Sequence, residues 1–145
     1  HPFESRGLLH CIVRLGPRMP DLHCINVHLG LFERGRQWQV RALCERIRQT
    51  VPRNAPLVIA GDFNDWRYRA NRQLIDQLAV VEVFEAIKGR PARTFPSMLP
   101  LFRLDRIYVR GLDVIDARVH YAYPGRRLSD HAALAATCEL AAGRR

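Results

Sequence analysis

The chain has 145 residues, of which 48% are hydrophobic, and a formal net charge of +9 that comes from 22 arginines and one lysine against 14 acidic residues. This length is enough for one domain with a core, and the sequence predicts neither a transmembrane segment nor a signal peptide. The positive charge favours polyanionic partners, although an arginine bias also fits a merely solvated surface.

The chain begins with two short apolar segments, residues 8–14 and 22–27, that have the composition of buried β-strands. A glycine and two prolines lie between them and predict a turn, so we expect the two strands to pair antiparallel. Residues 33–51 then carry apolar side chains at helical spacing, and this pattern predicts a helix that Pro52 ends.

Strands and helices continue to interleave in the rest of the chain. Residues 57–60 predict a buried strand, and residues 71–83 have a second helical pattern. Residues 90–102 contain three prolines and predict a loop. Strand-like segments follow at residues 104–109, 114–121 and 132–140. The alternation predicts a layered α/β domain with a mixed sheet.

The cysteines are scattered and form no C-x-x-C pair, so zinc and redox motifs are unsupported. Free buried thiols are the default for such cysteines, and they fit a reducing compartment. We therefore expect a cytoplasmic protein.

Asp62 and Asn64 directly follow the strand predicted at residues 57–60. They are two residues apart, so the period of a strand puts both side chains on one face. Strand ends often carry active-site groups because a rigid sheet holds them in position. A turn is the simpler explanation of this motif taken alone, because Asp and Asn both favour turns.

Three further polar motifs lie where strands end or begin. His28 ends the second strand, Asp105 opens the strand at 104–109, and Asp130 and His131 precede the last strand. Each has a simpler explanation alone, such as a polar turn, or for Asp105 an ion pair with a neighbouring arginine. Together they supply carboxylates, an amide and imidazoles. This set suits phosphoryl chemistry, because Mg²⁺ binds oxygen ligands and an imidazole beside a carboxylate transfers protons.

In this order the motifs resemble those of the endonuclease/exonuclease/phosphatase superfamily, which includes DNase I-like nucleases, abasic-site endonucleases, sphingomyelinases and inositol-polyphosphate phosphatases. The segment Thr94-Phe95-Pro96 is similar to uncharacterised bacterial members. The resemblance implies a two-sheet α/β sandwich with helices outside. The matching residues are Asn26-x-His28-Leu29, Gly61-Asp62-Phe63-Asn64, Leu104-Asp105-Arg106-Ile107 and Ser129-Asp130-His131.

The resemblance also implies catalytic roles. His131 orients or deprotonates the attacking water or contacts the phosphate, and Asp105 fixes the tautomer of its ring. Asp62 activates water or protonates the leaving group. Asn64 holds the phosphate or the water, and His28 contacts the phosphate.

A divalent cofactor is implied as well: Mg²⁺, with Mn²⁺ as an alternative. The metal side of the site is expected to include Asp130, Asp62 and Asn64. Arg67 and Arg103 are candidates for binding the phosphate-containing substrate, because they lie beside the motifs and carry positive charge.

One part of the family pattern is absent from the sequence. Family members begin with an Asn-bearing strand and then a Gln-Glu motif, whose Glu is a principal metal ligand. We therefore interpret residues 1–145 as the C-terminal part of one domain, half of the two-sheet sandwich. Alone it should be inactive and should expose an apolar face, through which it self-associates or pairs with its own N-terminal half.

The substrate stays open at this point. Nucleic acid is the first expectation because the chain is strongly basic. Against it, the sequence has no stripe of aromatic and basic residues, and Trp66 is a single candidate for base stacking. A phospholipid or a small phosphorylated molecule is the alternative. A non-catalytic α/β interaction module that keeps the motif residues as relics is the alternative from another class.

Overall fold

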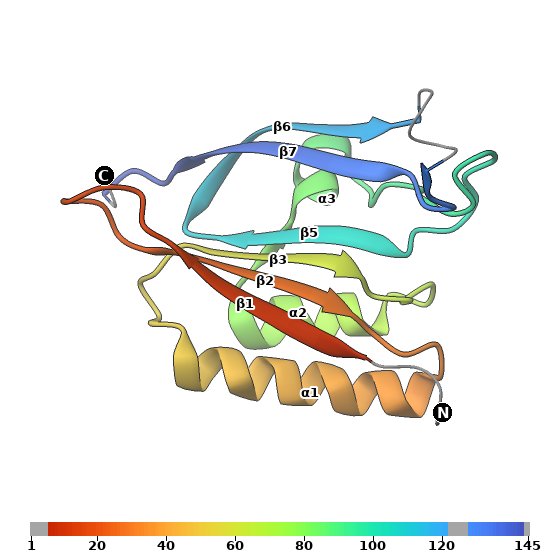
Figure 1. Ribbon diagram of the computed structural model, residues 1–145, viewed down its shortest axis with the longest axis horizontal. Helices are drawn as coiled ribbons and strands as arrows, with labels where there is room; N and C mark the ends of the chain where they lie inside the picture. Colours follow the sequence, from red (N-terminus) through yellow and green to blue (C-terminus); the bar gives the residue numbers. More distant parts are fainter. Residues whose placement is uncertain (1–5, 122–127, 144–145) are drawn as a thin grey trace.

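The computed structural model describes residues 6–121 and 128–143 (Figure 1). Five strands form one mixed sheet in the order β1-β2-β3-β5-β4, and β6 and β7 form a separate antiparallel hairpin. The predicted α/β class with a mixed sheet is confirmed. The elements in chain order are β1 (Gly7–Val13), β2 (Leu22–His28), α1 (Glu33–Thr50), β3 (Leu57–Asp62), α2 (Arg69–Leu78), β4 (Val81–Glu82), α3 (Val83–Lys88), β5 (Asp105–Arg110), β6 (Leu112–His120) and β7 (Ala133–Leu140).

The pairing of the central strands brings three motifs to one edge of the sheet. β1 and β2 are antiparallel, as predicted from the turn between them. β2 runs parallel to β3 with His28 opposite Asp62, and β3 runs antiparallel to β5 with Asp62 opposite Asp105. These three side chains therefore lie in a row across neighbouring strands.

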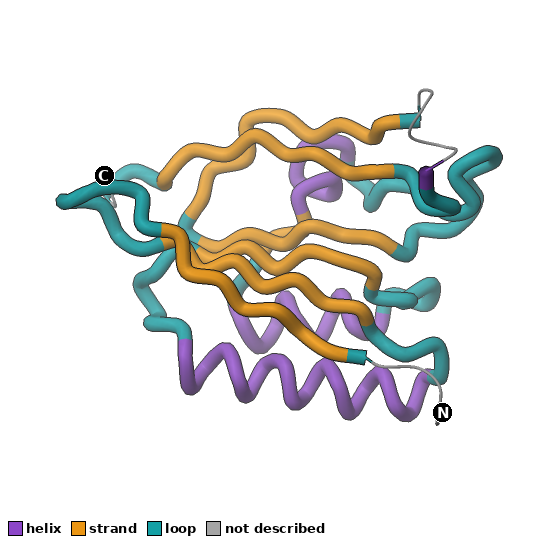
Figure 2. The backbone as a smooth tube through the Cα atoms, in the orientation of Figure 1, coloured by secondary structure: helices purple, strands orange, loops and turns teal. Residues whose placement is uncertain are grey.

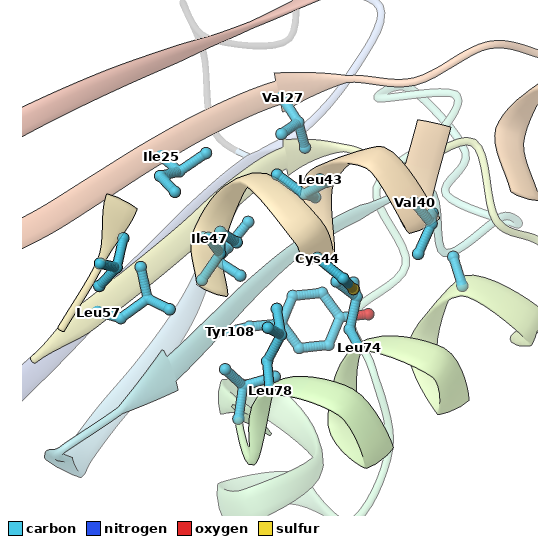
Figure 3. Packing of buried hydrophobic residues seen from close by; sticks show 14 of the residues in the cluster. Ile25, Val27, Val40, Leu43, Cys44, Ile47, Leu57, Leu74, Leu78 and Tyr108 are labelled. Atoms are coloured by element: carbon cyan, nitrogen blue, oxygen red, sulfur yellow. The ribbon is translucent and has the colours of Figure 1, made fainter. Parts of the chain in front are cut away.

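Helices α1 and α2 cover one face of the sheet (Figures 1 and 2). Apolar positions spaced three and four residues apart on α1 point to the sheet and to α2, where they are buried (Figure 3). Each large aliphatic side chain buried in this way contributes about 1.5–3 kcal/mol to the stability of the fold. This packed layer therefore holds the strand ends rigidly in place. The labelled members of the cluster are Ile25, Val27, Val40, Leu43, Cys44, Ile47, Leu57, Leu74, Leu78 and Tyr108.

The hairpin of β6 and β7 lies on the opposite side of the sheet (Figure 2). A second cluster, which joins α3, β5 and β6, includes Phe84, Val109 and Ala117. The side chain of Leu9 on β1 remains 61% exposed. Pairing with the rest of the domain, or self-association, stays a prediction. No helix in residues 6–121 and 128–143 is long and apolar enough to cross a lipid bilayer.

The helix predicted at residues 71–83 is wrong at both ends. α2 spans Arg69–Leu78 and stops at Ala79, which has the left-handed φ of 53°. Two residues of β4 and the one-and-a-half-turn helix α3 follow instead. Val80 beyond the helix end is apolar and buried as well, so the apolar spacing continues past Leu78. Periodicity alone therefore could not locate the end of α2.

Candidate active site

The end of β3, the start of β5 and the segment just before β7 bring together two carboxylates and an imidazole. His131 Nδ1 lies 2.7 Å from Asp105 Oδ2, and His131 Nε2 lies 4.0 Å from Asp62 Oδ2. Asp62, Asp105 and His131 each offer a ligand atom, and these atoms lie within 4.8 Å of one another. His28 Nε2 is 3.5 Å from Asp62 Oδ2, and its ring also contacts Arg6. The structure thus assembles four of the residues singled out by sequence.

Gly61 permits the close approach of β2 and β3 beneath this cluster. Its φ is +137°, and a Cβ atom there would lie 2.0 Å from the carbonyl oxygen of Val27. Any side chain would therefore push the two strands apart. A glycine is therefore required before Asp62, because it allows the close strand spacing that brings Asp62 near His28.

The segment that carries His131 is fixed by Ser97, which the sequence analysis did not single out, and by Ser129 of the Ser129-Asp130-His131 motif. Ser97 N donates to the carbonyl of Asp130 at 2.7 Å, and Ser97 Oγ donates to the carbonyl of Ser129 at 2.9 Å. The backbone N–H of His131 donates to Ser129 Oγ at 3.1 Å. The ring of Phe95 packs against the imidazole with 4.9 Å between centroids. These contacts set the direction of the His131 ring.

The sequence analysis named Thr94 only as part of the Thr94-Phe95-Pro96 resemblance and did not predict its structural role. It is fully buried, and its Oγ1 accepts a hydrogen bond from the backbone N–H of Asp105 at 3.3 Å. Its carbonyl accepts from Ala132 N at 2.8 Å. Thr94 therefore joins the start of β5 to the start of β7, the two places from which Asp105 and His131 project. Its position in a proline-rich loop gives no periodic signal for such a role.

Asn64 ties the loop after β3 to the loop after β2. Its backbone has the left-handed φ of 48°, and its N–H donates to Asp62 Oδ1 at 2.8 Å. Its side-chain amide is buried and donates to the carbonyl of Leu29 at 2.8 Å. Asn64 therefore lies next to the cluster, while its contact with phosphate or water stays a prediction.

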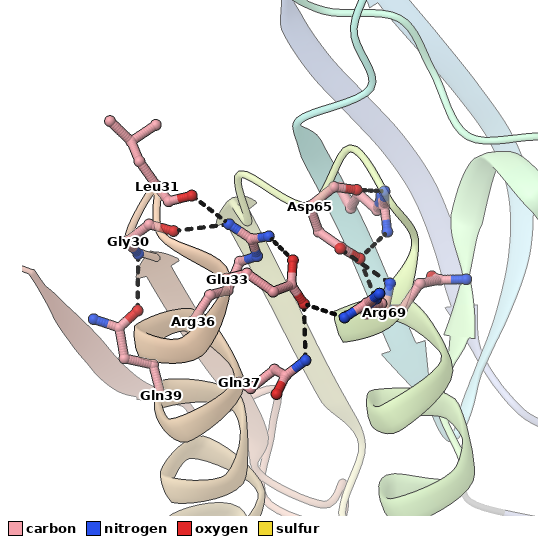
Figure 4. A network of polar contacts seen from close by, with 10 residues as sticks. Gly30, Leu31, Glu33, Arg36, Gln37, Gln39, Asp65 and Arg69 are labelled. Carbon is pink, nitrogen blue, oxygen red and sulfur yellow. Dashed lines mark hydrogen bonds and ion pairs between the residues drawn. The ribbon is translucent and has the colours of Figure 1, made fainter.

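A polar network fixes the loop that follows β2 (Figure 4). The buried guanidinium of Arg36 donates to the carbonyls of Gly30 and Leu31, at 3.1 and 2.8 Å, and pairs with Glu33. Glu33 in turn lies 3.6 Å from Arg69 Nη1 at the start of α2. The loops after β2 and β3 are thus held in one arrangement.

Three predicted residues lie outside the cluster of Asp62, Asp105 and His131. The side chains of Asp130 and Arg67 are exposed. Arg103 is half-buried, and its Nε donates to the carbonyl of Pro91 at 2.9 Å. Their roles at the metal and at the substrate stay predictions.

The cluster has unusual electrostatics. Burial raises the pKa of the Asp62 carboxyl above its usual range; the hydrogen bond from Asn64 N–H opposes this rise, and the neighbouring charge of Asp105 adds to it. Burial alone would lower the pKa of His131, but the hydrogen bond and the charge of Asp105, with the charge of Asp62, raise it above the usual value. Two carboxylates this close favour a bound cation, and their oxygens are the ligands that hard divalent ions prefer.

The raised pKa of His131 gives a prediction for the metal-free full-length protein. NMR titration of the ring should give a midpoint above the ordinary value of about 6.5, and Asp105→Asn should lower it. Because folding raises this pKa, the stability contributed by the pair is fully present below about pH 6.5 and is lost as the pH rises through the folded value. Equal midpoints in the two proteins would show that Asp105 does not act on this ring.

Comparison with known proteins assigns the family. The model of the endonuclease/exonuclease/phosphatase family matches residues 2–131. The chain belongs to this family, whose members are phosphoester hydrolases, both nucleases and phosphatases.

Particular relatives agree in sequence or in fold. The chain is 45% identical over 139 residues to the uncharacterized protein YbhP of Escherichia coli K12. The match covers 94% of this chain and 54% of that relative. It thus spans about half the length of the curated relative. D. rerio TDP2 in complex with a single-strand DNA product shares the fold, with a TM-score of 0.73, 20% identity and coverage of 95% of this chain and 64% of the other. The mannosyl-6-phosphatase Bt3783 of Bacteroides thetaiotaomicron matches with a TM-score of 0.68, 19% identity and coverage of 83% and 52%. These two structures support the DNase I-like fold.

Proposed function

We propose that the full-length protein is a Mg²⁺-dependent phosphodiesterase whose catalytic groups include Asp62, Asp105 and His131. The observation that carries the proposal is the cluster of two carboxylates and one imidazole at the edge of a rigid sheet, within 4.8 Å of one another. Groups with perturbed pKa values gathered at strand ends are characteristic of active sites. Family membership supports phosphoester hydrolysis in general.

Asp62, Asp105 and His131 have different roles in the proposed hydrolysis. Asp105 accepts the Nδ1 proton of His131, which leaves Nε2 to orient or deprotonate the attacking water or to contact a phosphoryl oxygen. Asp62 is assigned to exchange a proton with the water or with the leaving oxygen, because it lies opposite Asp105 and 4.0 Å from His131 Nε2. Backbone hydrogen bonds hold these groups in position before substrate binds.

We assign Asp62 and Asp130 to the divalent ion, with Asn64 beside them, and we expect the remaining ligand from the part of the domain outside this chain. Asp105 is engaged by His131, so it is less suited to this role. Mg²⁺ or Mn²⁺, when bound, would neutralise the negative charge that develops on the phosphoryl oxygens.

Metal removal should therefore abolish activity. Full-length protein is expected to hydrolyse bis(p-nitrophenyl) phosphate with Mg²⁺ and to lose about 100-fold or more of that rate in EDTA, because the charge on the phosphoryl group is no longer neutralised. Added Mg²⁺ should restore the rate. A rate unaffected by EDTA would contradict the metal assignment, and no hydrolysis under any condition would favour the non-catalytic interaction module.

Nucleic acid is one substrate class with specific support. The chain carries a net charge of +9, and the structurally similar TDP2 has been crystallised with a single-strand DNA product. Binding through phosphates should weaken steeply with salt. Cleavage of a single-stranded DNA oligonucleotide by the full-length protein, measured at low and physiological salt, tests this candidate directly.

A further inference from the structure

A cavity lined by positive charge lies between α3, the loop that follows it and β6 (Figure 1). Its volume is about 590 Å³, and sites for small organic ligands typically have about 300–1,000 Å³. Five of its eleven lining residues are cationic and none is acidic, whereas 23 of the 145 residues of the chain are cationic. Positive charge is therefore concentrated here well beyond the arginine bias of the chain. We call this hollow the basic cavity, and its cationic residues are Lys88, Arg90, Arg93, Arg103 and Arg118.

Three arginines of the basic cavity are available to an anion. Arg90 and Arg93 are exposed, and Arg103 is half-buried, with its Nε donating to the carbonyl of Pro91 at 2.9 Å. None of the three is paired with a carboxylate within residues 6–121 and 128–143. The bond to Pro91 holds the Arg103 guanidinium at the wall of the cavity before any ligand arrives.

The other two cations have an acidic neighbour. Arg118 Nε lies 2.5 Å from Asp116 Oδ2, and the charge of Lys88 also acts on this carboxylate. The positive charge that remains for a ligand is therefore mainly that of the three arginines. Guanidinium groups bind phosphate oxygens through parallel hydrogen bonds. Three of them carry more charge than a single phosphate neutralises, and two linked phosphates match them better.

The cavity also offers an aromatic surface. Tyr121 lines it and is 43% exposed, and its hydroxyl donates to the carbonyl of Arg93 at 3.0 Å. This bond fixes the ring beside the arginines. The buried side chains of Phe84 and Ala117 add apolar lining. A fixed, exposed ring is a surface on which a planar base stacks.

The basic cavity is separate from the catalytic cluster. The hollow that contains Asp105 and His131 has a volume of about 350 Å³ and shares no lining residue with the basic cavity. The chain passes from Arg93 of the cavity to the fully buried Thr94, which bonds the backbone of Asp105. A ligand in the basic cavity is therefore not in contact with the groups assigned to hydrolysis, so it is a second ligand and not the substrate.

We propose that the basic cavity binds a nucleoside diphosphate, with the diphosphate on Arg90, Arg93 and Arg103 and the base on Tyr121. A nucleic-acid strand fits less well, because it needs a groove of positive charge along its backbone, and this cavity is a single hollow beside which Asp116 lies. No bond is made or broken in this site. The inference does not depend on the proposed hydrolase function.

The test is isothermal titration calorimetry of the full-length protein with ADP in EDTA. EDTA removes divalent ions, so the carboxylates of the catalytic cluster repel the anion and ADP is not hydrolysed. We expect one ADP per chain, with an affinity that falls as salt is added. Pyrophosphate, which has no base, and adenosine, which has no phosphate, should each bind more weakly than ADP.

Two variants assign the contacts. Arg90→Gln combined with Arg93→Gln should weaken ADP binding about tenfold or more, because charge-assisted hydrogen bonds are lost. Tyr121→Leu should weaken the binding of ADP and leave that of pyrophosphate unchanged. Arg41→Gln combined with Arg53→Gln is the matched control, since it removes the same charge from exposed positions outside the cavity and should bind ADP like wild type.

Each result decides for or against the basic cavity, provided that thermal unfolding shows the variants to be folded. No ADP binding by the wild type, or unchanged binding in the Arg90 and Arg93 variant, would overturn the site. An equal loss in the control variant would show that net charge alone attracts the nucleotide, and this too would overturn it. Equal affinity for pyrophosphate and ADP would overturn the assignment of the base to Tyr121.

Discussion

Replacing Asp62 with asparagine should lower the kcat of the full-length protein by about 10²- to 10⁴-fold, the range that a general acid–base group typically contributes. The change keeps the shape of the side chain and its place opposite His28 and Asp105, so the fold should be intact. It removes the charge and the exchangeable carboxyl proton. His131→Ala should give a loss of the same order, because it removes the imidazole that lies 2.7 Å from Asp105.

The measurement is the Mg²⁺-dependent rate on a soluble phosphodiester, with thermal unfolding recorded for each variant. Asp76→Asn is the matched control, since Asp76 is exposed on α2 and is not a member of the cluster of Asp62, Asp105 and His131. Near-wild-type turnover in Asp62→Asn would remove Asp62 from the mechanism. Asp105→Asn combined with His131→Ala should cost much less than the sum of the single changes, because the two groups act as one unit.

The row of catalytic candidates was predictable because strand ends are visible in sequence. An apolar run that stops at a polar residue marks the point where a buried strand reaches the edge of the sheet, and this rule located His28 and Asp62. Asp105 was located because it opens such a run. The simpler explanation of Asp105, an ion pair with a neighbouring arginine, is not what the structure shows. Asp105 bonds His131, while Arg106 points to the opposite face and pairs with Asp65. Alternation along β5 separates the two neighbours.

The structural roles of Thr94 and Ser97 could not be predicted in the same way. Each acts through one or two hydrogen bonds to backbone groups that are far away in sequence, such as Asp105 N and the carbonyl of Asp130. Loops that join distant segments have no period, so single-sequence patterns do not show them. The short helix α3 was not predicted for a related reason, because six residues are too few to show a helical period.

Asp65 was also missed, although it immediately follows the Gly61-Asp62-Phe63-Asn64 motif. Both it and Arg106 have fully buried side chains, with Asp65 Oδ2 3.3 Å from Arg106 Nη1. Sequence alone suggests an exposed loop carboxylate here, because charged residues are seldom buried unless paired. The partner lies 41 positions further along the chain. The pair places the loop after β3 against β5, directly behind the catalytic cluster.

Removing this carboxylate should give the largest loss of stability. Asp65→Ala is expected to lower the free energy of unfolding of the full-length protein by about 3–5 kcal/mol, because it leaves the Arg106 guanidinium buried without its counter-charge. The change also removes the acceptor for the N–H groups of Arg69 and Asn71, both at 3.0 Å, in the first turn of α2. Urea unfolding followed by circular dichroism measures the difference.

Two comparisons make this prediction specific to burial. Glu45→Ala breaks an exposed pair with Arg48 on α1 and should cost no more than about 1 kcal/mol. Asp65→Leu combined with Arg106→Met removes both charges of the pair and should recover part of the stability lost in Asp65→Ala, because the Arg106 guanidinium is no longer buried without Asp65. The recovery is incomplete because the buried Glu82 loses the nearby charge of Arg106. If Asp65→Ala were as mild as Glu45→Ala, the Asp65–Arg106 pair would not hold the loop after β3. The position of Asn64 beside the cluster would then need another cause.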